Sequence, residues 1–280
     1  MPAVSVIVVT HNSAADIAAC LDSLRHHPPK RSHEVIVVDN ASTDGTTAIV
    51  EEDYPEVRLV CSDRRRGFAA NCNAGARLAR GAILFLLNPD ARVTPGSVDS
   101  LAAYLDAHRS VAVVGPRLVY PDGSPQPSAR RFPTMAVTLI RRSPLRLMWP
   151  HSARERRHLM LDTAFNEPAV VDWLLGAALT VRASVYMALG GMDEGYRLYC
   201  EDIDLCRRAW QTCGSVVLLP EAVVAHDLSE LTRRRFITRA TLWHMGSMAR
   251  YVRLHGVRPP PVKAGRRTSD ADQTDRLLPV

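Results

Sequence analysis

Val4-Ser-Val-Ile-Val-Val-Thr10 is a short run of apolar, mostly β-branched residues. Such a run is typical of a strand that is covered on both faces within a parallel sheet. Apolar residues recur at helical spacing over 17–24, and Pro28-Pro29 ends this helix before a second apolar run at 34–38. A strand, a helix and a further strand form the repeating unit of an open α/β sheet, so the sequence predicts that fold class.

The same unit repeats through the first 116 residues. The pattern predicts further strands at 57–60, 83–87 and 111–114, and helices at 46–53, at 69–79 and after Thr94. Ser42 or Thr43 is positioned to cap the helix at 46–53. A chain of 280 residues with 46% hydrophobic content can bury a sizeable core. We therefore expect a doubly wound, mostly parallel sheet with a Rossmann-like nucleotide-binding half.

The pattern changes after this half. Residues 117–168 are rich in Pro, Ser and Arg and weakly periodic, which predicts a loop-rich insertion. The regular pattern then returns, with strands predicted at 170–174, 177–181 and 215–219 and helices ending at 189 and spanning 201–213 and 232–254. We expect one domain over 1–256, with a donor half at 1–116 and a smaller acceptor half with C-terminal helices at 169–256. The polar, charged tail at 257–280 is expected to be disordered.

Composition limits the classes of function. The chain has neither a signal-peptide pattern at its start nor the run of about 18 apolar residues that a membrane-spanning helix needs, so we expect a cytoplasmic protein. Its six cysteines lack the spacing of a disulfide framework or zinc site. The net charge is +6, and arginines gather at 141–157, 233–239 and 250–267. These clusters indicate an anionic partner: nucleic acid, anionic lipid or a pyrophosphate substrate.

Polar residues follow the predicted strands, where ligands bind in open parallel sheets. Thr10 and Asn12 follow the first strand, Asp39 follows the second, and Asn88-Pro-Asp90 follows the fourth. Asp39 alone would also suit a turn. Neither a G-x-G-x-x-G motif after the first strand nor a G-x-x-x-x-G-K-[ST] loop is present, which disfavours dehydrogenases and kinases. A diphosphate can still bind if a divalent cation neutralises it, and Asp90 can supply a ligand to that cation.

A second acidic cluster contains Glu201 and Asp202, at the start of a predicted helix. These acids could simply stabilise the helix dipole. The flexible approach through Gly190-Gly-Met-Asp-Glu-Gly195 favours a second interpretation, in which one carboxylate takes a proton from an acceptor hydroxyl. Asp204 is expected to be structural, near Arg207 and Arg208.

Two single residues have open interpretations. His226 follows an apolar run at 223–225, and it is either a structural histidine or a metal ligand. Trp173 is either a core aromatic residue or a wall for the sugar or acceptor.

The chain resembles the family 2 glycosyltransferases of the GT-A fold, and within them the bacterial rhamnosyltransferase-type enzymes. The matching segments occur in the expected order at 6–12, 37–46, 67–75, 86–90, 171–177, 190–194 and 201–208. One departure is Arg64-Arg-Arg66, which stands where relatives usually carry an Asn before the Gly-Phe pair.

This resemblance implies roles for individual residues. Asp202 would be the catalytic base, assisted by Glu201, while Asp90 and His226 would hold Mg²⁺ or Mn²⁺. Trp173 and Gly176 would contact the sugar or acceptor. The residues that would bind the donor nucleotide are Thr10, Asn12, Asp39, Asn71 and Asn88.

We therefore predict an inverting, metal-dependent glycosyltransferase. The predicted donor is a nucleotide sugar, with dTDP-rhamnose as the first choice, and the acceptor is a cell-envelope glycan or a polyprenyl-diphosphate-linked sugar. Nucleic acid is not expected as a partner. Arg233, Arg234, Arg235 and Arg239 would contact an anionic membrane at the inner face of the plasma membrane, or form only a solvated basic face.

Two other classes of protein remain as alternatives. A sugar-1-phosphate nucleotidyltransferase would use a similar sheet, but we would expect a glycine-rich loop after its first strand. A noncatalytic module that binds nucleic acid or membrane would explain the arginines, but it would leave Asp39, Asp90, Glu201 and Asp202 without a common purpose.

Overall fold

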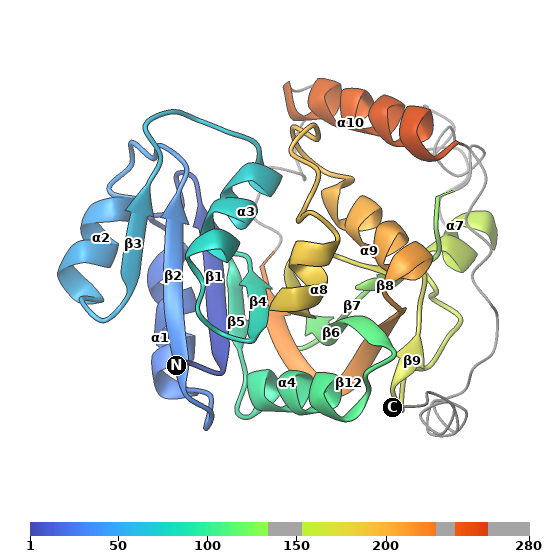
Figure 1. Ribbon diagram of the computed structural model, residues 1–280, viewed down its shortest axis with the longest axis horizontal. Coiled ribbons are helices and arrows are strands. Elements are labelled where there is room, and N and C mark those ends of the chain that lie inside the picture. The colour runs from blue at the N-terminus through green and yellow to red at the C-terminus, as the bar shows by residue number, and fades with distance from the viewer. Residues whose placement is uncertain (134–152, 228–238, 257–280) are drawn as a thin grey trace.

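A central sheet organises the chain in the computed structural model, which describes residues 1–133, 153–227 and 239–256 (Figure 1). Ten strands of the described part form this sheet, eight of them in the order β3-β2-β1-β4-β11-β6-β12-β5. The N-terminal strands run parallel and are β1 (Val4–Thr10), β2 (His33–Asp39), β3 (Arg58–Cys61) and β4 (Ile83–Leu87). Their carboxyl ends therefore meet at one edge of the sheet.

The other half of the sheet is mixed. β11 (Ala178–Arg182) lies antiparallel between β4 and β6 (Val111–Val119), and β12 (Ser215–His226) runs parallel to β6. Three short strands pair antiparallel at its margins: β5 (Ala91–Val93), β7 (Pro125–Gln126) and β9 (Ala169–Val170). A separate ribbon pairs β8 (Ala129–Arg130) with β10 (Trp173–Leu174).

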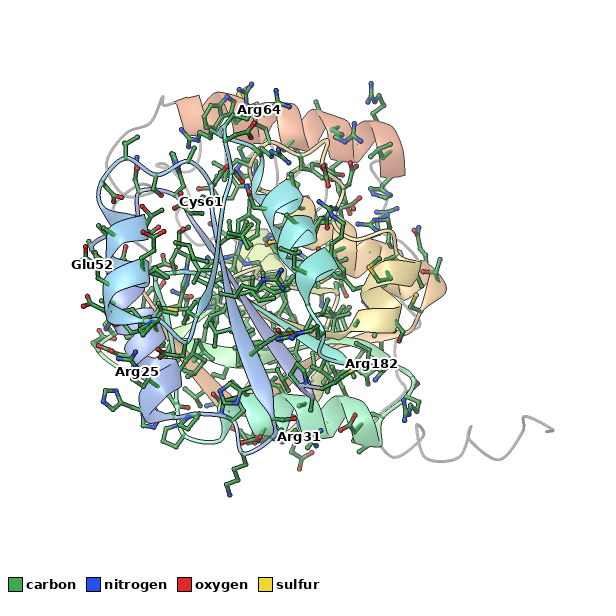
Figure 2. All side chains as sticks on the ribbon, turned by 60° about the vertical axis from the view of Figure 1, so that its left-hand side comes forward. Arg25, Arg31, Glu52, Cys61, Arg64 and Arg182 are labelled. Carbon is green, nitrogen blue, oxygen red and sulfur yellow. The ribbon has the colours of Figure 1, made fainter. Side chains whose placement is uncertain are left out.

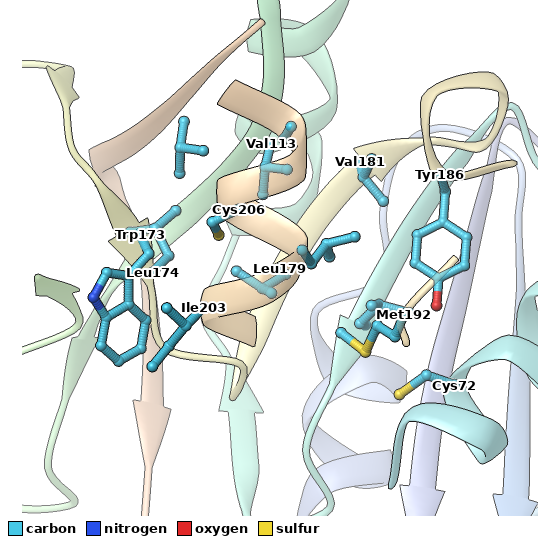
Figure 3. Close-up of a cluster of buried hydrophobic side chains, with 14 of the residues drawn as sticks. Cys72, Val113, Trp173, Leu174, Leu179, Val181, Tyr186, Met192, Ile203 and Cys206 are labelled. Atoms are coloured by element: carbon cyan, nitrogen blue, oxygen red, sulfur yellow. The ribbon is translucent and has the colours of Figure 1, made fainter. Parts of the chain in front are cut away.

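Helices cover both faces of the sheet. Along β1, Val4, Val6 and Val8 enter one buried cluster, whereas Ile7 and Val9 enter the other, because successive side chains of a strand point to opposite faces. The first cluster is covered by α1 (Ile17–His26), α2 (Thr46–Asp53) and α4 (Ser97–Ala107). The second is covered by α3 (Phe68–Leu78), α8 (Ala183–Ala188) and α9 (Glu201–Thr212), and part of it is drawn in Figure 3.

The expected doubly wound, mostly parallel α/β fold is thus confirmed, with differences at the ends of elements. The strands predicted at 111–114 and 215–219 continue to Val119 and His226, because β12 keeps pairing with β6 past irregularities in register and then pairs with β5. The strand predicted at 170–174 is two strands, β9 and β10, in different sheets. The described part of 117–168 also contains a short helix, α7 (Ala153–His158), and the predicted tail at 257–280 lies outside the described residues.

Hydrogen bonds of Asn73 in α3 connect the first half of the chain to the second. Its Nδ2 donates to the Met192 carbonyl (2.8 Å), while its Oδ1 accepts from the Met192 N–H (2.9 Å) and the Tyr186 hydroxyl (2.7 Å). A Cβ on Gly191, whose φ is +74°, would lie 2.4 Å from Asn73 Oδ1. This junction fixes the segment that leads into α9.

The outermost helix, α10 (Arg239–His255), packs over α9 (Figure 1). Asp204 of α9 is 1% exposed and accepts hydrogen bonds from Arg208 Nε (2.7 Å), His255 Nε2 (2.6 Å) and the Tyr196 hydroxyl (3.2 Å). The proximity of Asp204 to Arg208 that the sequence predicted is confirmed. These contacts anchor α10 on the first turn of α9, directly behind Glu201 and Asp202.

Candidate active site

Asp39 is held rigidly at the carboxyl end of β2. It pairs in register with Thr10 of β1, whose hydroxyl donates to Asp39 Oδ1 (2.8 Å), and the Ser42 N–H donates to Oδ2 (2.8 Å). Asp39 is 2% exposed, so its carboxylate is buried but fully hydrogen-bonded. The structure brings Thr10 and Asp39 together at the sheet edge, as the sequence led us to expect.

Asn12 joins the loop after β1 to the loop after β2. Its Oδ1 accepts from the Thr43 N–H (2.9 Å), and its N–H donates to the Ser42 hydroxyl (2.9 Å). Asn12 and Ala41 both have positive φ, at 52° and 56°, and such strained backbone gathers at functional sites. The predicted capping of α2 by Ser42 or Thr43 is wrong, because both serve this loop junction while Gly45 occupies the N-cap with no side-chain cap bond.

Asn71 of α3 lies behind this edge. Its side chain is fully buried, donates from Nδ2 to the Gly67 carbonyl (2.9 Å) and accepts from the Ser62 hydroxyl at Oδ1 (3.1 Å). The sequence predicted a contact between Asn71 and the donor. The structure instead places this side chain under the 62–67 loop, which it holds in position.

The 62–67 loop carries the three arginines noted in the sequence. Figure 2 shows Arg64 beyond Cys61, close to α10. Trp243 of α10 lies between two guanidinium groups, with Arg65 at 5.3 Å and Arg197 at 4.9 Å from its ring centre. Cation–π contacts of this kind connect the donor-side loop to the segment before α9 through α10.

Asp90 and His226 meet where β4, β5 and β12 converge. The Asp227 N–H donates to the Asp90 carbonyl (3.0 Å), and His226 Nε2 lies 3.3 Å from Asp90 Oδ1. On the other side of the ring, His226 Nδ1 is 2.8 Å from Gln126 Oε1, while Gln126 Nε2 donates to the His226 carbonyl (3.4 Å). An amide oxygen can only accept, so Nδ1 carries a proton and Nε2 is the ring nitrogen that faces Asp90.

This pair fits a divalent cation. Asp90 Oδ1 is buried and accepts no hydrogen bond, which leaves a carboxylate oxygen ready to bind a metal. Burial raises the pKa of Asp16, and the charges of Asp90 and Asp227 raise it further, so negative charge is concentrated here. No group of three or more such ligands occurs in the described parts of the chain. Two protein ligands suffice for a cation that substrate phosphates and water also coordinate.

Glu201 and Asp202 are the first two residues of α9, and the backbone directly before them is strained. Tyr199 and Cys200, directly before them, have φ of 64° and 74°. Asp202 Oδ1 accepts from the Ile203 N–H (2.8 Å), and its Oδ2 accepts from the Gly176 N–H (3.0 Å). A Cβ at position 176 would lie 3.2 Å from Asp202 Cβ, so only glycine allows this close approach without displacement.

The two carboxylates differ in environment. Burial, and then the neighbouring charge of Asp202, raise the pKa of Glu201 to about 8, and Glu201 Oε2 accepts no hydrogen bond. Burial also raises the pKa of Asp202, but the N–H groups of Ile203 and Gly176 and the charge of Arg130 act in the opposite direction. Of the two, Asp202 is therefore the one equipped to be ionised at neutral pH.

Glu201→Gln is expected to make the protein more stable at high pH. Because the pKa of Glu201 is higher in the folded than in the unfolded chain, ionising it destabilises the fold increasingly from about pH 5 up to about pH 8. Glutamine does not ionise, so the variant's advantage should grow over this range to a few kcal/mol, on the order of magnitude of such pKa shifts. Urea unfolding at both pH values checks this, and a difference independent of pH would contradict it.

A short series of contacts joins the Asp90–His226 pair to the Glu201–Asp202 pair. Asp202 contacts Gly176, and the carbonyl of the next residue, Ala177, accepts a hydrogen bond from the Asn88 N–H (2.8 Å). Asn88 is two residues before Asp90. The structure thus connects Asp202 to Asp90 through one continuous set of contacts, although more than 100 residues separate them in the sequence.

Trp173 is more buried than a sugar-binding wall would be. It is 3% exposed, and its indole N–H donates to the Arg131 carbonyl (2.8 Å). Arg130 covers the ring, with its guanidinium carbon 5.1 Å from the ring centre. Of the two interpretations of Trp173, the structure therefore favours the core aromatic residue. The sequence analysis missed Arg130 and Gln126, which lie in the segment that it predicted to be loop-rich.

Known proteins share both the sequence and the fold. Residues 5–165 match the family described as Glycosyl transferase family 2. The chain is 32% identical over 242 residues to the N-acetylglucosaminyl-diphospho-decaprenol L-rhamnosyltransferase of Mycobacterium tuberculosis (strain ATCC 25618 / H37Rv), covering 82% of this chain and 77% of the relative. These matches show the family: the chain belongs to glycosyl transferase family 2 and is a glycosyltransferase.

Solved structures show the same fold at lower identity. GalNAc-T7 with UDP, GalNAc and Mn²⁺ aligns with a TM-score of 0.68 at 19% identity, over 91% of this chain and 48% of its own. The mannosyltransferase PcManGT of Pyrobaculum calidifontis with GDP-Man and Mn²⁺ aligns with a TM-score of 0.62 at 22% identity, over 93% and 66%. The chain thus spans about half of the first and two thirds of the second. The GT-A fold is confirmed.

None of the described helices is both long and apolar enough to cross a bilayer.

Proposed function

We propose that this glycosyltransferase is an inverting, metal-dependent enzyme that transfers L-rhamnose from dTDP-rhamnose to a sugar carried on a polyprenyl diphosphate. The continuous contact from Asp202 through Gly176, Ala177 and Asn88 to Asp90 supports this proposal most strongly, because it joins a proton acceptor to a cation ligand. The mycobacterial relative, whose name gives both the sugar and a diphospho-decaprenol acceptor, supports the choice of substrates.

Asp202 acts as the general base. It takes the proton of an acceptor hydroxyl as that oxygen bonds to the anomeric carbon, and the bond from this carbon to the diphosphate breaks with its electron pair leaving on the nucleoside diphosphate. Attack opposite the leaving group inverts the anomeric configuration. The Gly176 and Ile203 N–H groups orient the carboxylate, and Glu201 stays protonated at neutral pH, so it adds no second negative charge.

Asp90 Oδ1 and His226 Nε2 would hold Mg²⁺ or Mn²⁺. When bound, such a cation neutralises the charge that develops on the leaving diphosphate. Gln126 supports this role, because its contact with Nδ1 keeps the imidazole in the tautomer that can bind a metal. At the other end of the site, the Asn12 loop forms the surface proposed for the nucleoside, and Thr10 and Asp39 lie buried directly beneath it until the donor binds.

A donor screen tests this function. Purified protein is incubated with nucleotide sugars, beginning with dTDP-rhamnose, with Mn²⁺ or with EDTA, and both thermal stabilisation and nucleoside diphosphate release are measured. Stabilisation by a nucleotide sugar only in the presence of Mn²⁺ supports a metal-dependent transferase. Equal stabilisation in EDTA would contradict metal dependence, and preference for another nucleotide sugar would overturn the choice of rhamnose.

A lipid-linked acceptor also implies that the protein contacts the inner face of a membrane peripherally. Met245, Ala249 and Arg253 are exposed at four-residue spacing on α10, so one side of this helix is apolar with a basic end. The contact predicted for Arg233, Arg234 and Arg235, and for the side chain of Arg239, lies outside what the structure describes.

The membrane contact gives a direct prediction. The protein should sediment with vesicles containing anionic lipid more than with zwitterionic vesicles, and Met245→Asp with Arg253→Glu should reduce this binding about tenfold, since each basic residue contributes about 1 kcal/mol. Sedimentation that does not depend on lipid charge would contradict an anionic-leaflet contact. The variant's melting temperature serves as its control for folding.

A further inference from the structure

The guanidinium group of Arg130 packs against a buried aromatic ring. Arg130 is paired in register with Trp173 in the β8–β10 ribbon, and its guanidinium group covers the indole ring at 5.1 Å. The indole is itself buried and hydrogen-bonded to the Arg131 carbonyl. A guanidinium group stacked on a buried ring loses little further freedom when it binds a ligand, so Arg130 is preorganised.

The same ribbon leads to the proposed base. The Leu175 N–H donates to the Ser128 carbonyl (2.9 Å), which fixes β10 beside β8, and Gly176 then holds Asp202. Figure 3 shows Trp173 close to Ile203, the residue after Asp202. The charge of Arg130 also acts on Asp202 and counters the effect of burial on its pKa. Arg130 is therefore a cation beside the base.

Two neighbouring arginines contact other segments of the chain. Arg131 forms an ion pair with Asp172 (3.2 Å), whose side chain is 8% exposed. Arg207 donates to the Tyr251 hydroxyl (3.1 Å) and to the His255 carbonyl (2.9 Å), on the side of α9 that faces α10. Of these three arginines, Arg130 is the one whose charge acts on Asp202.

We propose that Arg130 binds the diphosphate of the acceptor, and that this contact presents a hydroxyl of the attached sugar to Asp202. The proposal rests on the proposed function and assigns the acceptor's anionic group to a particular residue. In a glycosyl diphosphate, the same pyranose ring carries the diphosphate and the hydroxyls. A cation and a base on adjoining segments, β8 and the start of α9, can therefore contact the two parts of one acceptor. Guanidinium groups bind phosphate oxygens through paired hydrogen bonds.

A role for Arg130 that is limited to lowering the pKa of Asp202 is less consistent with the site. A cation near a general base lowers its affinity for protons, which opposes the task of Asp202. Binding an acceptor diphosphate neutralises Arg130 when the acceptor arrives. The base then becomes stronger only in the complex that is ready to react.

Arg130→Gln tests this proposal. Two acceptors that carry the same sugar are compared, a short-chain lipid diphosphate and a neutral alkyl glycoside. We expect the KM for the diphosphate acceptor to rise about 10- to 100-fold relative to the KM for the neutral glycoside, as for loss of a charged hydrogen-bonded contact, while donor affinity stays as in the wild type. The effect of the lost charge on the pKa of Asp202 acts with both acceptors, so it cancels in this ratio. Arg130→Lys should restore part of the affinity, and Arg131→Gln serves as a neighbouring charge control, expected within about twofold of wild type.

A binding measurement separates this proposal from the proposed function. Affinity for a short-chain lipid diphosphate without sugar is measured by calorimetry in EDTA, which removes the cation needed at Asp90. Weaker binding by Arg130→Gln supports the proposal even if no transfer is found with any donor. The proposal would be overturned by equal binding of the lipid diphosphate to the wild type and to Arg130→Gln. It would also be overturned by an equal loss of activity with both acceptors, or by a shifted pH profile with unchanged KM.

Discussion

Asp202→Asn is expected to lower kcat by about 10²- to 10⁴-fold, the usual contribution of a positioned general base. The asparagine side chain has the same shape but cannot accept the proton of the acceptor hydroxyl. Asn Oδ1 can still accept the hydrogen bond of Gly176 or Ile203, so α9 should start at the same residue. Donor affinity should therefore stay close to that of the wild type, while kcat decreases.

Two measurements make this result specific to the base. Donor affinity by calorimetry and the melting temperature show whether the variant still folds and binds. Glu201→Gln serves as a comparison because Glu201 is already protonated at neutral pH in the proposed mechanism, so it should lose far less activity than Asp202→Asn. A kcat within about threefold of the wild type for Asp202→Asn would contradict the assignment of the base.

The parts of the site that the sequence predicted correctly depend on local pattern. Apolar runs located β1, β2 and β4, and the carboxyl ends of parallel strands must meet at one edge. Thr10 and Asp39 are the last residues of β1 and β2, and Asp90 closely follows β4, so all three could be placed at this edge from the sequence. For the same reason, the contact between Thr10 and Asp39 could be expected before the structure was known.

The remaining parts depend on contacts between distant segments. Gln126 contacts His226 across 100 residues, and Asn73 contacts Met192 across 119, so neither local propensity nor hydrophobic spacing carries a signal for them. Asn71 lies in a segment that matches the family, but its burial depends on how the 62–67 loop closes over α3. Trp173 was uncertain because an aromatic residue in a short strand suits both a core and a binding wall.

Asp90→Ala is expected to weaken donor binding in saturating Mn²⁺ by about 100-fold or more, since even residues that only support metal ligands commonly contribute 10- to 100-fold to metal affinity. Asp90 Oδ1 is buried without a hydrogen bond, so the substitution removes a carboxylate oxygen that lies 3.3 Å from His226 Nε2 and could coordinate a cation with it. His226 alone provides no negative charge. The concentrated charge of Asp16 and Asp227 cannot replace a missing ligand.

Calorimetry of donor binding distinguishes loss of the cation from general damage to the site. In EDTA, wild type and Asp90→Ala should bind the donor equally weakly, whereas in Mn²⁺ only the wild type should gain affinity. Asp122→Asn, a change in an exposed turn, should behave as the wild type does in both solutions. Unchanged affinity of Asp90→Ala with saturating Mn²⁺ would show that the donor diphosphate is neutralised by other groups, and the arginines of the 62–67 loop would then be the next to test.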